Sequence, residues 1–149
     1  MTLILLPVFE VHPHEEVSFP HVLAIMKEIV ADGVVERPLI VARSCRTLLD
    51  GHHRYSALRI LEVDLLPCFL IDYDDASQVE VSSWRPGEHV TSQTVRTAAA
   101  TGMLLPPKTS RHVLKQEIPP MRFPFSHLIS ARTTQQKFPD VHLEGAKHA

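Results

Sequence analysis

The chain has 149 residues, 44% of them hydrophobic and 21% charged, which suits one compact domain and argues against a largely disordered chain. Its formal net charge of −2 gives no general affinity for nucleic acid, and no apolar run reaches the roughly 18 residues that a transmembrane helix needs. The two cysteines, Cys45 and Cys68, form no CxxC motif, so neither a disulfide scaffold nor a cysteine-rich zinc site is expected.

The first third of the chain is predicted to contain a strand, a helix and a hairpin. Residues 3–11 are apolar and lack the basic segment and the small-residue cleavage site of a signal peptide, so we expect a strand and a soluble, cytoplasmic protein. Apolar side chains at three- and four-residue spacing predict an amphipathic helix over residues 21–32, closed by Gly33. Two short apolar runs, residues 38–41 and 47–49, predict a β-hairpin.

The middle of the chain continues the alternation of helices and strands. Residues 55–61 have helical composition, and residues 67–71 and 79–83 are predicted strands. Thr91 suits the N-cap of a helix over residues 92–101. Together these elements predict an α/β (α+β) domain in which a small mixed sheet is flanked by helices.

Composition and charge change along the chain. The predicted domain covers residues 1–115, and the proline-containing residues 116–149 form an extension that is either partly ordered against it or mobile. Residues 1–84 carry 13 acidic and 6 basic side chains, a net charge of −7, whereas residues 85–149 carry 4 and 9, a net charge of +5. If these parts pack together, the later one can bring cations to a site that the earlier one supplies with carboxylates, although simple mutual attraction explains the same counts.

The strongest candidate for chemistry is the segment Asp50, Gly51, His52, His53 and Arg54, at the predicted junction of a strand and a helix. Gly51 permits a tight turn and a close backbone approach, and the free N–H groups at the start of the helix favour an anion. His53 and Arg54 add side-chain donors, and Asp50 could hold Mg²⁺ against phosphates. The segment therefore predicts a phosphate site; the alternative is a turn capped by Asp50 with solvated histidines.

A second candidate segment follows two prolines later in the chain. Lys108 and Arg111 are cations, Thr109 and Ser110 carry hydroxyl groups, and His112 carries an imidazole. This concentration of cations and hydrogen-bonding groups suits the binding of a phosphate or carboxylate group. The alternative is a basic turn on the surface.

Two further residues are candidates on their own. Glu15, placed beside a phosphate site, can take the proton of a hydroxyl group; alternatively it is an acidic residue at the start of the following helix. Trp84, the only tryptophan, either packs in the core or walls a small-molecule pocket. The remaining histidines follow no metal-ligand spacing, so a zinc site is not expected.

These motifs, in this order, resemble the ParB/sulfiredoxin-like superfamily and, more closely, the free L-serine kinases. The matching segments cover about residues 3–115 and are His12–Glu15, Asp32–Gly33 with residues 38–41, Leu49–Arg54, Trp84 and Pro107–Leu114. The Asp-Gly-His-His-Arg sequence marks the superfamily, and its pairing with Pro-Lys-Thr-Ser-Arg-His indicates the kinases. The resemblance implies a fold with a small mixed sheet and phosphorylation of free L-serine by ATP or ADP, in cysteine or siderophore-precursor synthesis.

The resemblance also implies a role for each matching residue. Glu15 would be the general base on the serine hydroxyl, and Asp50 would place Mg²⁺. The segment from Gly51 to Arg54 would bind the nucleotide phosphates. Trp84 and the loop formed by residues 108–112 would hold the amino acid and the phosphoryl group in transfer.

Departures from the family leave rival functions open. The segment between Trp84 and Lys108 is short, whereas the archaeal kinases carry a long insertion there. His52 stands where sulfiredoxins have their reactive cysteine, so sulfinic-acid repair is not expected. One rival is a regulator that binds ATP or CTP without transferring phosphate. The other is a DNA-associated ParB-like module, which the net charge and the lack of a basic stripe disfavour. The sequence does not indicate an oligomeric state.

Overall fold

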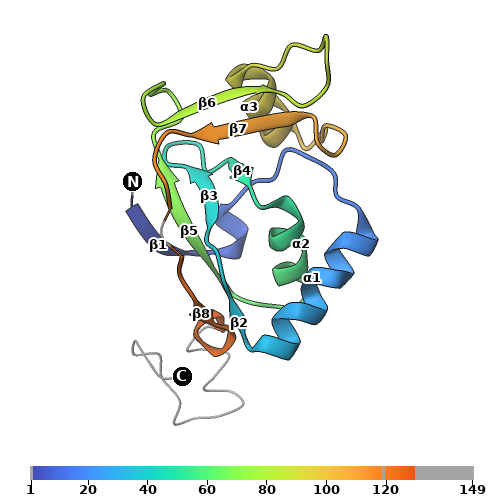
Figure 1. Cartoon of the computed structure of the whole chain (residues 1–149), viewed down its shortest axis with the longest axis vertical. Coiled ribbons are helices and arrows are strands. Elements are labelled where there is room, and N and C mark those ends of the chain that lie inside the picture. Colours follow the sequence, from blue (N-terminus) through green and yellow to red (C-terminus); the bar gives the residue numbers. More distant parts are fainter. Residues whose placement is uncertain (1, 119, 130–149) are drawn as a thin grey trace.

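A four-stranded mixed sheet lies at the centre of the computed structural model, which describes residues 2–118 and 120–129 of the chain (Figure 1). Its strands, in the order β1-β5-β3-β4, are β1 (Thr2–Pro7), β5 (Leu65–Ile71), β3 (Leu39–Ala42) and β4 (Leu48–Asp50). β3 runs parallel to β5, whereas the β1–β5 and β3–β4 pairs are antiparallel. The predicted hairpin and the predicted mixed sheet are therefore confirmed.

Helices and small sheets cover this central sheet. On one face lie α1 (Phe19–Asp32) and α2 (His52–Ile60), packed against each other. On the other face lie α3 (Ser92–Thr101) and the antiparallel pair β6 (Val79–Ser83) and β7 (Ser110–Leu114). A last pair joins β2 (Val34–Val35) to β8 (Phe123–Pro124). Among the helices of the described residues, none has both the length and the hydropathy for a bilayer crossing.

The central strand β3 separates two apolar cores. Its four residues are all buried; Leu39 and Val41 belong to the core under α1 and α2, and Ile40 and Ala42 belong to the core under α3. Successive side chains of a strand point to opposite faces, so an uninterrupted apolar run suits a strand that is covered on both sides.

The ends of two helices follow from local signals, as predicted. α1 ends at Gly33, whose φ of 71° is left-handed, a conformation that glycine adopts without the penalty of a Cβ atom. α3 begins with a capping box, in which Thr91 and Thr94 each accept a hydrogen bond from the other's backbone N–H. These interactions need no distant partner, which is why the sequence predicted both boundaries.

Two local expectations are wrong. The predicted strand over residues 3–11 ends at Pro7: the Val8 N–H still donates to the Asp64 carbonyl of the neighbouring chain segment, but Val8–Glu10 then turn into a short 3-10 helix. The loop expected over residues 108–112 becomes strand β7 from Ser110 onward, because it pairs with β6.

The segment after residue 115 contributes to the core as far as it is described. β8 pairs with β2, and Leu128, in the short 3-10 helix Phe125–Leu128, is fully buried in the core beneath α1 and α2. Residues 130–149 lie outside the described residues. The division at residue 115 stays a prediction.

Candidate active site

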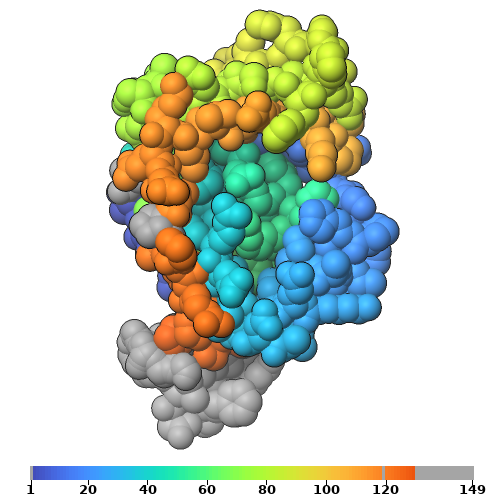
Figure 2. All heavy atoms as spheres, viewed as in Figure 1, coloured from blue at the N-terminus to red at the C-terminus, as the bar shows by residue number. Residues whose placement is uncertain are grey.

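Three segments that are distant in the chain line one cavity of about 410 Å³. They are the stretch before α1 together with the first turns of α1, the turn from β4 into α2, and the segment that leads into and starts β7; Trp84, just after β6, also lines the cavity. Figure 2 shows a hollow bounded by blue α1 residues, teal α2 residues and the orange β7 segment. Of the predicted site residues, the lining includes Glu15, Asp50, Gly51, His52, His53, Arg54, Trp84, Lys108, Ser110 and His112.

The turn into α2 requires glycine at position 51. Its φ of 102° is left-handed, and a Cβ atom there would lie 2.6 Å from the Leu39 Cδ2 and 2.7 Å from an Arg54 terminal nitrogen. Gly51 is the N-cap of α2, and no side chain caps the helix. The first backbone N–H groups of α2 therefore remain available to an anion, at the positive end of the helix dipole.

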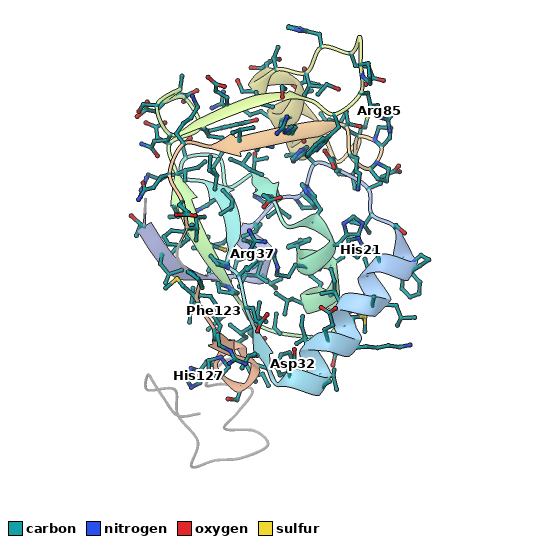
Figure 3. All side chains as sticks on the ribbon, in the orientation of Figure 1. His21, Asp32, Arg37, Arg85, Phe123 and His127 are labelled. Carbon is teal, nitrogen blue, oxygen red and sulfur yellow. The ribbon has the colours of Figure 1, made fainter. Side chains whose placement is uncertain are left out.

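The two histidines of this turn hold the segment before α1. The Nε2 of His52 accepts a hydrogen bond of 3.0 Å from the backbone N–H of His14, and the Nε2 of His53 accepts one of 3.0 Å from Ser18. Burial lowers the pKa of both imidazoles, that of His52 well below its ordinary value, so both accept as neutral rings. His21 lies on α1 beside α2, and its ring is 4.2 Å from that of His53 (Figure 3). His52 is buried rather than solvated.

Arg54 and Asp50 present opposite charges to the cavity. One guanidinium nitrogen of Arg54 donates to the Pro38 carbonyl at 3.3 Å, and burial lowers the pKa of the guanidinium, an effect that Asp50 opposes. Asp50 is exposed at the end of β4. No cluster of three metal-ligating side chains exists among residues 2–118 and 120–129. A lone carboxylate still suits Mg²⁺, which is commonly held by one or two carboxylates together with substrate phosphates.

The carboxylate of Glu15 is fixed by the start of β7. Its Oε1 accepts from the Lys108 N–H at 3.1 Å, and its Oε2 accepts from the Ser110 N–H at 2.7 Å and from the Ser110 hydroxyl at 2.6 Å. The backbone on either side of Glu15 also bonds to Leu105. The Glu16 N–H donates to the Leu105 carbonyl and the Leu105 N–H donates to the His14 carbonyl, both at 2.8 Å. An early carboxylate and a late segment are thus joined, as the unequal charges of the two parts of the chain suggested.

The residues from 108 to 112 have different surroundings. Ser110 and His112 face the cavity, whereas Arg111 points outward, with its guanidinium carbon 4.7 Å from the centre of the Trp84 ring, because side chains alternate along a strand. The hydroxyl of Thr109 donates to the Pro106 carbonyl at 2.6 Å and braces the turn. Neither Thr109 nor Arg111 lines the cavity.

His14 is a site residue for which the sequence predicted no role. It is fully buried, and its imidazole lies 2.7 Å from the Leu48 carbonyl through Nδ1 and 2.7 Å from the Ser110 hydroxyl through Nε2. The signals in the sequence are its place next to Glu15 and within the matching segment His12–Glu15. Tyr73 is a second such residue, since its hydroxyl lies 2.8 Å from the Nε2 of His112.

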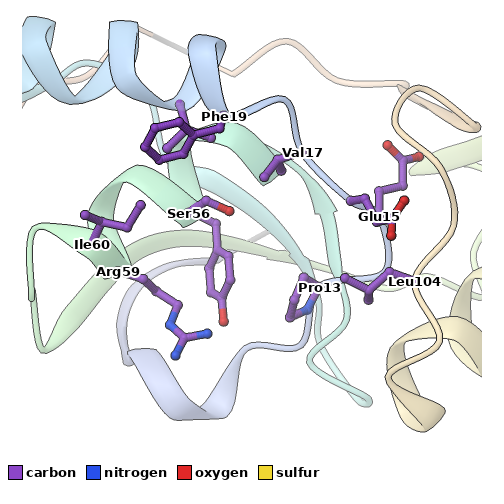
Figure 4. A pocket seen from close by; sticks show the side chains of 11 residues that line it. Pro13, Glu15, Val17, Phe19, Ser56, Arg59, Ile60 and Leu104 are labelled. Atoms are coloured by element: carbon purple, nitrogen blue, oxygen red, sulfur yellow. The ribbon is translucent and has the colours of Figure 1, made fainter.

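A second cavity, of about 540 Å³, has a different character. Its walls come from α1, α2 and the segment after α3, and the side chains of Phe19, Ile60 and Leu104 face it (Figure 4). Glu15 lies at its edge, so this residue stands between the two cavities. The walls are mainly apolar, and only Arg59 among them is a cation. Phosphate chemistry therefore suits the first cavity.

Known proteins resemble part of this chain. It is 33% identical over 87 residues to an ATP-dependent L-serine kinase of Staphylothermus marinus, 37% over 78 residues to a ParB-like protein of Sulfolobus acidocaldarius, and 27% over 78 residues to the ADP-dependent L-serine kinase SerK of Thermococcus kodakarensis. These matches include 56%, 50% and 50% of the chain, but they span only 34%, 37% and 32% of the relatives. The chain matches no protein-family model.

The fold has close counterparts among solved structures. A free serine kinase in complex with AMP superposes with a TM-score of 0.76 at 15% sequence identity, over 85% of this chain and 93% of that one. The predicted fold class is confirmed. The chain therefore has the fold of a free serine kinase, and about half of its sequence is similar to L-serine kinases and to a ParB-like protein.

Proposed function

We propose that this protein transfers a phosphoryl group from ATP or ADP to the hydroxyl of free L-serine, giving O-phospho-L-serine. The observation that carries the proposal is the placement of Glu15. Its carboxylate lines the same cavity as the uncapped start of α2 and the Lys108 side chain. A base next to an anion site is what a phosphoryl transfer to a hydroxyl group needs. The names of the relatives support the same reaction.

The phosphate side of the site is assigned to the turn from β4 into α2. The free N–H groups of α2, together with Arg54 and Lys108, would neutralise the phosphates, since phosphoryl transfer depends mainly on alignment and charge neutralisation. Asp50 would hold Mg²⁺ together with phosphate oxygens. The ion would supply further neutralisation of the charge that develops on the transferred group.

The amino-acid side of the site is assigned to Trp84 and the start of β7. Trp84 would form one wall, kept in place by Arg111, while the Lys108 ammonium would attract the serine carboxylate or the phosphoryl group. Thr109 would act indirectly, because its hydroxyl already bonds to a backbone carbonyl. The substrate hydroxyl would approach Glu15, which removes its proton.

The second candidate function is a nucleotide-binding regulator, which the similarity to a ParB-like protein favours. Such a protein needs the phosphate site but no base. The three hydrogen bonds that orient the Glu15 carboxylate favour the kinase, because orienting a carboxylate toward a cavity serves proton removal.

Phosphorus NMR of the protein with Mg²⁺, L-serine and either ATP or ADP tests the proposal. New phosphoserine is expected. Bound but unchanged nucleotide would instead indicate the regulator, and retention on duplex DNA at physiological salt would indicate the DNA-associated module. Running the same assay with L-threonine identifies the acceptor.

Glu15→Gln tests the assignment of the base. Turnover should fall by about 10²–10⁴-fold while nucleotide affinity is retained, because this is the usual effect of losing a general base. Glu16→Gln is the matched control, since it neutralises an adjacent, exposed carboxylate that does not line the first cavity. If the Glu15 variant produces phosphoserine at the rate of the wild type, Glu15 is not the base.

A further inference from the structure

A buried line of polar atoms leads from Glu15 into the protein. The Glu15 Oε2 lies 2.6 Å from the Ser110 hydroxyl oxygen, which lies 2.7 Å from the Nε2 of His14. The Nδ1 of His14 lies 2.7 Å from the carbonyl of Leu48. His14 is fully buried, and the Glu15 side chain is 10% exposed, so the line connects the cavity with the interior.

The protons of this line can be counted. A backbone carbonyl only accepts, so the Nδ1 of His14 carries a hydrogen and donates it to Leu48. In the neutral ring the Nε2 is then an acceptor. Ser110 has one hydroxyl hydrogen, yet its oxygen makes short contacts with two acceptors, the Nε2 of His14 and the Oε2 of Glu15. With Glu15 ionised, the Ser110–His14 and Ser110–Glu15 contacts share the single hydroxyl hydrogen of Ser110. One further proton can therefore be held between Glu15 and His14.

The surroundings of His14 favour this arrangement. Its ring meets those of His52 and His112 edge-on, with centroids 4.5 and 5.7 Å away. Burial, the largest effect on each ring, lowers the pKa of all three histidines, so His14 is neutral at rest between two uncharged neighbours. Glu15 opposes this effect and favours a proton on His14, with 3.7 Å between the Nε2 and the Oε2.

We propose that His14, acting through the Ser110 hydroxyl, is the second acceptor of the proton that Glu15 removes from the substrate. This inference rests on the proposed function. The substrate O–H bond breaks, its electron pair forms the new P–O bond, and its proton binds to the Glu15 carboxylate. As the substrate proton reaches the Oε2 of Glu15, a proton passes from Oε2 to the Ser110 oxygen while the Ser110 hydroxyl proton passes to the Nε2 of His14, in the same event as the phosphoryl transfer. The serine hydroxyl is regenerated, and an imidazolium faces the Glu15 carboxylate.

The relay gives Glu15 a partner that never touches the substrate. His14 is therefore a positioning and proton-accepting residue behind the base. After product release the proton returns by the same path and leaves through the cavity. Because two protons move together between Glu15 and His14, the transfer depends on the hydroxyl of Ser110 and not only on its backbone N–H.

Two substitutions of Ser110 test the relay in single-turnover phosphoryl transfer. Ser110→Ala removes the hydroxyl but keeps the backbone N–H that donates to Glu15, and Ser110→Thr keeps a hydroxyl. The rate is measured in mixtures of H₂O and D₂O. For the wild type, a plot of the rate against the deuterium fraction should be curved, because several protons move. Ser110→Ala should be at least about tenfold slower, less affected than Glu15→Gln, with a linear dependence; Ser110→Thr should restore the curve. A linear wild-type dependence together with an unchanged Ser110→Ala rate would overturn the relay.

Nitrogen NMR of the His14 ring, recorded without substrates, gives a readout that does not depend on phosphoryl transfer. We expect the hydrogen on Nδ1 and a pKa of His14 that falls in Glu15→Gln, since the carboxylate favours the imidazolium. Equal pKa values in the wild type, Glu15→Gln and Ser110→Ala would show that the groups share no proton and would refute the inference. If the pKa values are coupled but no amino acid is phosphorylated, the proposed function fails, and with it this use of the relay.

Discussion

Replacing Gly51 should cost this fold more than replacing another left-handed glycine. In Gly51→Ala, the new methyl group would lie 2.6 Å from the Cδ2 of Leu39, which is fully buried and cannot withdraw. It would also lie 2.7 Å from the Arg54 guanidinium, which could move only by giving up its bond to Pro38. The left-handed backbone costs about 1–2 kcal/mol and the overpacking about 1–3 kcal/mol. The free energy of unfolding should therefore fall by about 2–5 kcal/mol.

Gly102→Ala is the matched control for this substitution. Gly102 also has a left-handed backbone, with a φ of 76°, but a Cβ atom there meets nothing within 4 Å. The free energy of unfolding of Gly102→Ala should therefore fall only by the backbone cost of about 1–2 kcal/mol. Urea denaturation of both variants, with the midpoint and the slope compared, separates the two contributions. If Gly51→Ala is no less stable than Gly102→Ala, close packing is not the reason for glycine at position 51.

Three further predictions concern two half-buried side chains, Arg54 and His112, and the buried Leu128. Arg54→Ala should weaken nucleotide binding by roughly 10–100-fold, since a hydrogen bond from a charged group contributes about 1.5–3 kcal/mol; unchanged affinity in calorimetry would remove Arg54 from the phosphate site. Burial lowers the pKa of His112 from 6.5 to about 3, so the stability tied to its neutral form is present above pH 6.5 and is lost as the pH falls toward 3. Urea midpoints across this range should fall more steeply in the wild type than in His112→Gln, and parallel curves would contradict the assignment. Leu128→Ala should lower the free energy of unfolding by about 2–5 kcal/mol, whereas a loss under about 1 kcal/mol would mean that this residue is not part of the core.

The candidate site was predictable in its residue types but not in its contacts. The motif from Asp50 to Arg54 is local, and its chemistry can be inferred from glycine, a helix start and neighbouring donors. The orientation of Glu15 could not be inferred, because it depends on hydrogen bonds to Ser110, 95 residues away. His14 gave even less signal, since a histidine next to a glutamate has no defined role until Ser110 and Leu48 meet its two ring nitrogens.

The sequence by itself determined the features of this protein that rest on neighbouring residues. The helices end at Gly33 and Gly102 because glycine adopts the left-handed cap conformation without the penalty of a Cβ atom. Only the tertiary structure decided that residues 110–114 form a strand and that Leu128 completes a core. Both depend on partners far away in the chain, and the free energy that orders them exists only once those partners are in contact.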